Sequence, residues 1–389
     1  AWRRHPGDPD VGALFAESLM DLRPWDLWTL EGEPRPEVPE ILATLEAVLK
    51  IAPDHPQALH LTIHALEPSP HPERAFAAAD RLRHRLPGIG HLVHMPSHID
   101  VLLGRYEEAV EANRRALAAD RVHVARVGRK GFFTMYRAHN YHMLVYAAMF
   151  EGRSREALAA ARELVAEMPG GVVREMPDVL EAYLAVPLHV LVRFGRWEEI
   201  LREPPPARDL RALAAFRLYA RTLAFSSLGR LAEAEESLRD FEQAAAEVPE
   251  SRAAGNNGVR ALLEVAKAML EGELEYRRGG PDRAFERLRE AVKLDDALRY
   301  DEPRGWMQPP RHALGALLLE RGRAEEAEAV YRRDLERHPD NGWSLHGLAE
   351  CQRRLGRNEE AEKTAGRLRT AWARADVEIY GSCFCRRRA

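Results

Sequence analysis

One short phrase recurs along this chain and constrains its fold more than any other feature. It reads Gly-Arg-x-x-Glu, usually followed by alanine, and two intervals between successive copies are 34 residues long. Glycine ends a helix readily because it adopts the left-handed conformation without a Cβ clash, and acidic residues favour the first turn of the next helix. The phrase therefore predicts repeated helix–turn–helix units. It occurs at Gly104, Gly152, Gly195, Gly229, Gly322 and Gly356, with a looser copy at Gly280.

A period of 34 residues with paired helices is that of the tetratricopeptide repeat, whose helix pairs stack into a superhelix. Alanine, leucine, arginine and glutamate dominate the composition, which favours helix. We therefore predict an all-α fold, a tetratricopeptide-repeat-like right-handed α-solenoid spanning residues 1–389, with its N-terminal repeat truncated. Within it we expect a histidine-rich N-terminal half (1–203) and more regular C-terminal repeats (207–389), divided by the proline run 204–206.

Charge and hydropathy exclude two classes of partner. The 57 basic and 61 acidic residues give a net charge of −4, so no overall positive field favours nucleic acid. The sequence contains no run of 18 apolar residues, so we expect no membrane partner. Three cysteines are too few for a disulfide framework, and we expect a cytoplasmic location. The sequence does not indicate an oligomeric state.

Half of the chain's 16 histidines lie between positions 55 and 98, where two groups have helical spacing. Residues at i, i+3, i+4 and i+7 share one face of a helix. Imidazole is the commonest metal ligand, and histidine-rich sets with one carboxylate suit zinc, copper or iron. We therefore predict a metal site in the concave groove, with Glu67 as a ligand or catalytic base. The alternative is that these histidines hydrogen-bond to the backbone and to one another, or line a groove that binds a ligand without metal. The two groups are His60, His64 and Glu67, and His91, His94 and His98.

Within this set we predict that His64 and His98 are the central ligands. Apolar residues flank each of them and would anchor its helix, which leaves the histidines on the stripe facing the groove. Pro96 lies two residues before His98, where it kinks or starts the helix. His55 and His71 directly precede prolines, so we expect both to be turn residues pointing to solvent.

Four later histidines divide into two pairs. His139 and His142 are spaced i, i+3, and we predict that they complete the metal shell; a core or edge histidine pair is the alternative. His338 precedes a closing proline and His346 lies in a regular repeat, so neither is predicted to be a ligand.

A second set of residues combines aromatic, arginine and carboxylate side chains. Arginine beside aromatic rings suits a carboxylate or planar ligand. The alternative is a capped loop that packs on the next repeat. The residues predicted to bind a ligand are Trp25, Tyr136, Asn140, Glu302, Trp306, Arg311 and Trp343.

The chain ends with Cys383-Phe384-Cys385 and three arginines. A Cys-x-Cys pair holds copper or zinc, or acts as a redox pair, when a folded site surrounds it. Because terminal residues are commonly poorly ordered, we expect here a flexible, reduced tail.

Several phrases together resemble a bacterial family of tetratricopeptide-repeat proteins of uncharacterised function. The clearest is Gly-His-Leu-Val-His-Met-Pro-Ser-His-Ile at 90–99, which follows Ile-His-Ala-Leu-Glu at 63–67. The resemblance implies an all-helical repeat fold and no established activity, so the site must be argued from its residues. The other matching stretches are 16–28, 139–142, 301–303 and 341–343.

Two functions of different classes are compatible with these patterns. The first is a metal-dependent enzyme or small-molecule binder, built on the histidine groups, whose reaction the sequence does not specify. The second is a non-enzymatic scaffold that holds a peptide or protein partner in its groove. Histidine clustering favours the first for the middle of the chain, because a peptide groove uses asparagine, lysine and arginine instead.

Overall fold

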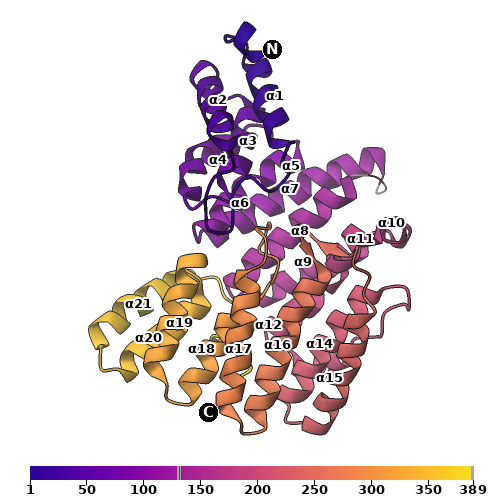
Figure 1. Cartoon of the computed structure of the whole chain (residues 1–389), viewed down its shortest axis with the longest axis vertical. Helices are drawn as coiled ribbons and strands as arrows, with labels where there is room; N and C mark the ends of the chain where they lie inside the picture. Colours follow the sequence, from indigo (N-terminus) through magenta and orange to yellow (C-terminus); the bar gives the residue numbers. More distant parts are fainter. Residues whose placement is uncertain (129–130, 132, 387–389) are drawn as a thin grey trace. The chain divides into compact units, whose positions relative to one another are not determined.

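The computed structural model describes residues 1–128, 131 and 133–386 (Figure 1). It divides into two compact units, Ala1–Gly128 and Arg129–Ala389, called unit 1 and unit 2 below. Outside helices, the described residues form one short antiparallel pair, β1 (Ala253–Ala254) with β2 (Asn257–Gly258), and one isolated bridge. The predicted all-α, tetratricopeptide-like α-solenoid class is confirmed.

Unit 1 is built from helices that pack in sequence order. α2 packs on α1 and α3, α3 packs on α4, and both α5 and α6 pack on α7. Two apolar clusters fill the space between these helices, one around Ile41 and one around Ile63. The helices are α1 (Pro9–Met20), α2 (Val38–Ile51), α3 (Pro56–Leu66), α4 (Phe76–Leu82), α5 (Gly90–His94), α6 (Pro96–Leu102) and α7 (Tyr106–Val127), with 3-10 turns η1 (Trp2–Arg4) and η2 (Pro72–Ala75).

Unit 2 consists mainly of antiparallel helix pairs stacked side by side (Figure 1). The pairs are α8 (Phe133–Phe150) with α9 (Ser154–Glu167), α12 (Val186–Arg193) with α13 (Trp197–Arg202), α14 (Arg211–Ser227) with α15 (Leu231–Ala246), α16 (Val259–Arg277) with α17 (Pro281–Asp296), α18 (Pro310–Glu320) with α19 (Ala324–Arg337), and α20 (Gly342–Arg354) with α21 (Asn358–Ala371). The short turns α10 (Gly170–Glu175), α11 (Pro177–Leu180) and η3 (Glu181–Ala185) lie between α9 and α12.

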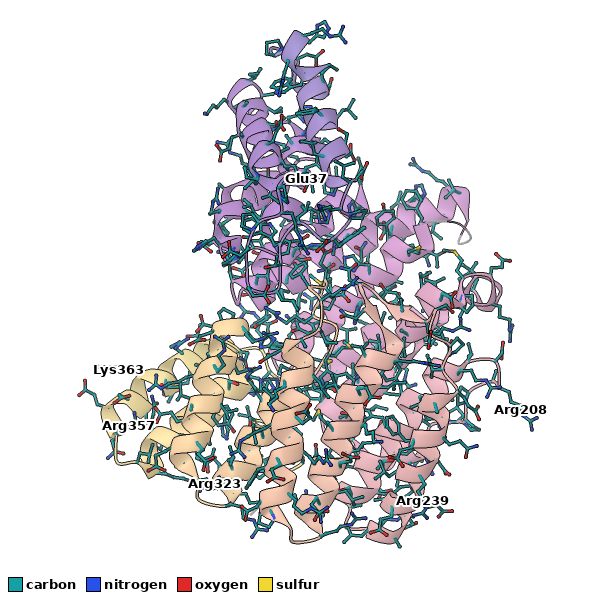
Figure 2. The ribbon with its side chains drawn as sticks, in the orientation of Figure 1. Glu37, Arg208, Arg239, Arg323, Arg357 and Lys363 are labelled. Atoms are coloured by element: carbon teal, nitrogen blue, oxygen red, sulfur yellow. A yellow bond between two sulfur atoms is a disulfide. The ribbon has the colours of Figure 1, made fainter. Side chains whose placement is uncertain are left out.

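The recurring phrase has the same structure at its six full copies, and only the looser copy at Gly280 differs. Its glycine has a positive φ, for example 75° at Gly322, which L side chains rarely adopt. The arginine that follows occupies the N-cap position and pairs with the glutamate three residues later, as Arg323 does with Glu326 at 2.5 Å. Figure 2 labels Arg323 and Arg357, the arginines of the last two copies, at the starts of α19 and α21. The phrase thus encodes the helix end, the turn and the next helix start.

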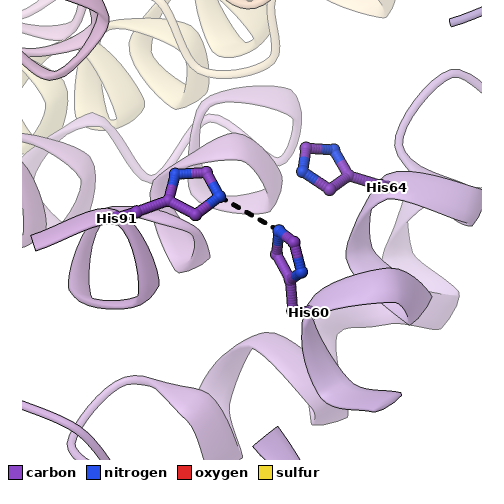
Figure 3. Close-up of side chains that lie close together, drawn as sticks. All are labelled: His60, His64 and His91. Carbon is purple, nitrogen blue, oxygen red and sulfur yellow. Dashed lines mark hydrogen bonds between the residues drawn. The ribbon is translucent and has the colours of Figure 1, made fainter. Parts of the chain in front are cut away.

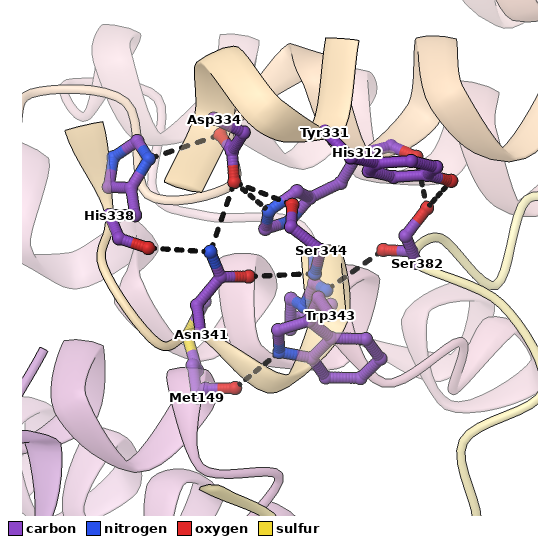
Figure 4. Close-up of polar contacts among 10 residues, drawn as sticks. Met149, His312, Tyr331, Asp334, His338, Asn341, Trp343, Ser344 and Ser382 are labelled. Carbon is purple, nitrogen blue, oxygen red and sulfur yellow. Dashed lines mark hydrogen bonds and ion pairs between the residues drawn. The ribbon is translucent and has the colours of Figure 1, made fainter. Parts of the chain in front are cut away.

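A buried carboxylate ties three helices of unit 2 together (Figure 4). Asp334 on α19 accepts hydrogen bonds from His312 Nε2 on α18 at 2.8 Å and from His338 Nδ1 at 3.1 Å. It also accepts from Asn341 Nδ2 at 3.1 Å and from Ser344 Oγ on α20 at 2.7 Å. His338 therefore has a structural partner, and that it is not a metal ligand stays a prediction.

The C-terminal segment 376–386 is packed, so the expectation of a flexible tail is wrong for these residues. Tyr331 and Ser382 share a 2.6 Å hydroxyl–hydroxyl bond, and the carbonyl of Ser382 accepts from Arg193 at 3.0 Å. Arg386 forms a two-pronged ion pair with Glu350 at 2.6 and 3.0 Å. Several hydrogen bonds together order this segment, because each one offsets part of the conformational entropy that the chain loses. The final described cysteines, 383 and 385, are joined by a disulfide.

The proline run 204–206 connects α13 to α14, and these two helices pack on each other. A single superhelix and a division near this run both stay predictions, because the two compact units are described separately.

Among the described residues, no helix combines the length and apolar character needed to cross a bilayer.

Candidate metal centre

Helix α3 presents two histidines because its other face is anchored in the core. Leu59 and Ile63 are buried in the apolar cluster that α3 shares with α4. His60 and His64 lie one position further round the helix and are half-buried. Glu67, directly after the last turn, is buried.

Helices α5 and α6 present the remaining histidines of unit 1. Gly90 lets α5 approach α7 closely, since a Cβ there would lie 2.0 Å from the Asp120 carboxylate. Pro96 occupies the first turn of α6, which confirms that it starts a helix, as expected from its fixed φ. His91 and His94 on α5 and His98 on α6 consequently lie over α3 and α7.

Three imidazoles converge at one point (Figure 3). The Nε2 atoms of His60 and His91 are 3.1 Å apart, and the His60 and His64 ring centroids are 4.8 Å apart. One ring nitrogen from each of the three lies within 4.8 Å of the others. Two nitrogens bound to one tetrahedral zinc ion are about 3.3 Å apart, because each Zn–N bond is about 2.0–2.1 Å. The 3.1 Å between His60 and His91 matches this spacing, and His64 lies close enough to join them; His60, His64 and His91 are called the three-histidine group below.

The carboxylate of Glu67 orients two histidines at once. His64 Nδ1 lies 2.6 Å from Oε1, and His98 Nδ1 lies 2.6 Å from Oε2. Burial raises the pKa of Glu67, but the adjoining His98 and His64 lower it to well below its usual value. The ionised carboxylate accepts a hydrogen bond from the Nδ1–H of each ring. The Nε2 lone pair of each ring therefore points away from Glu67. Metal-ligating histidines are commonly oriented in this way.

The next contact brings two imidazole nitrogens face to face. His94 Nδ1 lies 2.7 Å from Asn113 Oδ1, and the Asn113 amide donates to the Ala109 carbonyl at 2.8 Å, which fixes its orientation. His94 therefore carries its proton on Nδ1, as His98 does. Their Nε2 atoms are nevertheless 2.6 Å apart. Two lone pairs at this distance repel, so a proton shared between the two nitrogens would stabilise the pair.

Two sequence-based expectations for unit 1, those for Glu67 and His55, can be compared with the structure. Glu67 is 2% exposed and both its oxygens contact histidine rings, which is an orienting role; its part as a metal ligand or catalytic base stays a prediction. His55 does not point to solvent: its Nδ1 accepts from the Ala58 amide at 3.2 Å and its Nε2 lies 2.9 Å from Asp10. His55 therefore caps the N-terminus of α3, because its ring nitrogen accepts the backbone hydrogen bond that an Asp or Asn side chain accepts at this position. His71, with a side chain 67% exposed, does point to solvent.

Two predicted ligands lie on α8 of unit 2. His139 Nε2 is 3.9 Å from a Glu302 oxygen. His142 lines a cavity of about 40 Å³ together with Tyr183 and His189. Burial, and secondarily His189, lower the pKa of His142 to about 3, so this ring is neutral.

The aromatic and arginine residues predicted to bind a ligand have packing roles in unit 2. Trp306 is 1% exposed and packs edge-on against Tyr219. Trp343 is fully buried and donates to the Met149 carbonyl at 2.9 Å, while Arg311 pairs with Asp296 at 2.6 Å (Trp343 and Met149 in Figure 4).

Three further predicted residues have different surroundings. Tyr136 is half-buried and Asn140 fully buried on α8. Trp25, in unit 1, is 59% exposed and has a positive φ of 53°.

The sequence analysis did not predict a role for Asn113. A lone asparagine among the alanines of α7 is nevertheless a polar signal on a packed helix face.

Comparison with known proteins supports the repeat class. A family profile of the tetratricopeptide repeat matches residues 318–371, which cover α19, α20 and α21. Residues 318–371 therefore match the tetratricopeptide repeat, and the helix pairs of unit 2 have the helix–turn–helix form of that class. No curated protein matches the chain.

Three solved structures align with this chain at low sequence identity. A Rap protein complexed with competence and sporulation factor is 14% identical, with 95% of this chain and 99% of that chain covered and a TM-score of 0.41. The human IFIT1 dimer with m7Gppp-AAAA is 12% identical, with coverages of 94% and 72% and a TM-score of 0.38. The apo quorum sensor NprR of B. thuringiensis is 11% identical, with coverages of 93% and 87% and a TM-score of 0.37.

Proposed function

We propose that this protein binds a transition-metal ion, zinc, copper or iron, through the three-histidine group. The single observation that carries the proposal is the convergence of imidazole nitrogens from α3 and α5, with His60 Nε2 and His91 Nε2 at 3.1 Å. Neutral imidazole suits these metals better than magnesium or calcium, which prefer oxygen ligands. The region carries the resemblance to bacterial tetratricopeptide-repeat proteins.

The surroundings favour small-molecule chemistry at this ion over a purely structural role. Structural zinc sites are closed by four protein ligands, whereas three ligands leave a position for water or a small molecule. The His64 side chain is 17% exposed, so solvent reaches the group. A metal bound there would act as a Lewis acid on a small molecule in the open position.

The chain's own residues would hold the ligands in place. Glu67 fixes the ring of His64, and the same carboxylate connects through His98 to His94 and Asn113. Partners of this kind commonly alter metal affinity 10–100-fold when they are removed. The buried network therefore supports a preorganised site.

Elemental analysis of protein purified without a histidine tag tests the proposal. Wild-type protein should contain about one transition-metal ion per chain, and chelation should remove it. His60→Ala with His91→Ala should leave only background metal, while the exposed control His71→Ala should keep the full content. Metal-free wild-type protein that takes up none on dialysis, or full content in the double variant, would reject the metal site.

A second candidate function is peptide binding by unit 2. The observation that favours it is the segment 376–386, which the helices of unit 2 hold as they would a peptide ligand. Phe384 packs on Trp343 with ring centroids 5.4 Å apart. A labelled peptide with the sequence of residues 376–386 should bind a Phe384→Ala, Arg386→Ala chain more tightly than wild type. Equal binding to both would contradict this function.

A further inference from the structure

A second potential metal-binding set lies in unit 2, where α16 meets the C-terminal segment. One carboxylate oxygen of Glu273 and the sulfurs of Cys383 and Cys385 lie within 4.8 Å of one another. The two cysteines form a disulfide in this structure. Reduction would therefore place two thiols beside a carboxylate.

The carboxylate of Glu273 needs an explanation of its own. The residue is 4% exposed, and among the described residues it makes no hydrogen bond or ion pair. Burial raises its pKa to about 7, against the opposing charge of Arg277. A largely buried carboxylate beside two sulfurs can supply an oxygen ligand to a cation that binds there.

Hydrogen bonds hold the cysteines of the C-terminal segment in place. The Cys385 amide donates to Cys383 Sγ at 3.1 Å, and Arg277 donates to the Cys385 carbonyl. Cys385 is 1% exposed, so the sulfur sits within the fold.

We infer that, in the reduced protein, Cys383, Cys385 and Glu273 bind a divalent cation of the zinc type, and that disulfide formation abolishes this binding. Two thiolates and one carboxylate are a zinc ligand set, with the fourth position left to solvent. Two Zn–S bonds of about 2.3 Å span at most about 4.6 Å, so small side-chain rotations bring the three atoms into one coordination sphere.

The redox step balances with a small-molecule disulfide as the oxidant. The S–S bond between Cys383 and Cys385 forms while the S–S bond of the oxidant breaks. Two electrons pass from the protein thiolates to the oxidant, which leaves as two thiolates that take up protons from water, and the cation is released. The site would then report thiol redox state by holding or releasing its metal.

Cobalt(II) provides a test on the full-length chain, because only a thiolate ligand gives a sulfur-to-cobalt charge-transfer band. Protein reduced with a phosphine should show this band at about one equivalent of cobalt. Cys383→Ser and Cys385→Ser should each abolish it, as should prior treatment with oxidised glutathione. The matched control is Cys351→Ala, which removes the third, buried cysteine and should retain the band.

Glu273→Gln should keep the band but weaken cobalt binding at least tenfold. His60→Ala with His91→Ala should leave the band unchanged, so failure of the three-histidine group and failure of this inference are distinguishable. Absence of the band in reduced wild-type protein overturns the inference. So does a band that persists in either serine variant or disappears in Cys351→Ala.

Discussion

The Nε2 atoms of His60 and His91 lie 3.1 Å apart although 31 positions separate them in the sequence. They come from α3 and α5, whose backbones are placed by apolar contacts elsewhere in unit 1. Imidazole nitrogens that face each other at this distance share either a proton or a metal ion. The predictions below separate these cases and test the fold around them.

His64→Ala should reduce the metal content of the protein to background. His64 belongs to the three-histidine group and also contacts Glu67. Its loss therefore removes a metal ligand and leaves one oxygen of Glu67 without its histidine partner. His98→Ala should also lower the content, because His98 is the second partner of Glu67. Elemental analysis measures both. Full occupancy in His64→Ala, or unfolding of the metal-free variant by circular dichroism, would show that the histidine stripe is structural.

Glu67→Gln should weaken metal binding about 10–100-fold without abolishing it, the usual effect of removing a group that orients a ligand. The amide can accept from only one of the two rings, so either His64 or His98 loses its partner. Competition with a chelating dye measures the affinity. Unchanged affinity would contradict the orienting role.

His55→Ala should destabilise the protein by about 1 kcal/mol and leave its metal content unchanged. The side chain caps α3 and lies beside Asp10, and the loss of a cap costs on this order. Urea unfolding of the metal-free protein measures the effect. His71→Ala, at a solvent-exposed position, serves as the control and should change stability by less than about 0.5 kcal/mol.

Asp334→Ala should destabilise the protein by about 3–5 kcal/mol, because it leaves several buried donors without an acceptor. These donors are the side chains of His312, His338, Asn341 and Ser344 (Figure 4). Asp340→Asn, at a half-exposed carboxylate on the adjoining loop, should have an effect below about 1 kcal/mol. Equal denaturant midpoints for the two variants would disprove the role of the Asp334 network.

Asp295 should make stability fall as the pH rises. Burial raises its pKa from 3.8 to about 7, although Arg337 and Arg304 act in the opposite direction. Between these two values the folded state holds a proton that the unfolded state has lost, so the stability present below about pH 4 is lost as the pH rises through about 7.

Asp295→Asn should remove this loss and gain on the order of 2–4 kcal/mol at pH 8 relative to its effect at pH 4. The neighbouring Asp296 provides a control of opposite sign. Although burial raises its pKa, the hydrogen bond from Arg311 and the charges of nearby arginines lower it overall. Asp296→Asn should therefore lose stability at neutral pH. Urea midpoints across the pH range that show the same slope for Asp295→Asn and wild type would contradict the assignment.

Local chemistry by itself determined the repeat units. The left-handed glycine, the N-cap arginine and the glutamate three residues later act within one turn, so Gly322-Arg323 and its copies encode their structure without reference to the rest of the chain. The same holds for the helical spacing of His60 and His64 and for the helix start at Pro96. Each depends on backbone preferences and on neighbours less than two turns away.

Only the tertiary structure decided which side chains meet. Glu67 became an orienting residue because His98, on α6, occupies its second oxygen. Trp343 lies in the core, where the carbonyl of Met149, distant in the chain, accepts a hydrogen bond from its indole N–H. The C-terminal segment is ordered by contacts with helices far from it in the sequence. Long-range packing sets these pairs through burial of apolar area that no local pattern records. A sequence pattern can therefore name the histidines of a site, but the packing of α3 against its neighbours selects the partners.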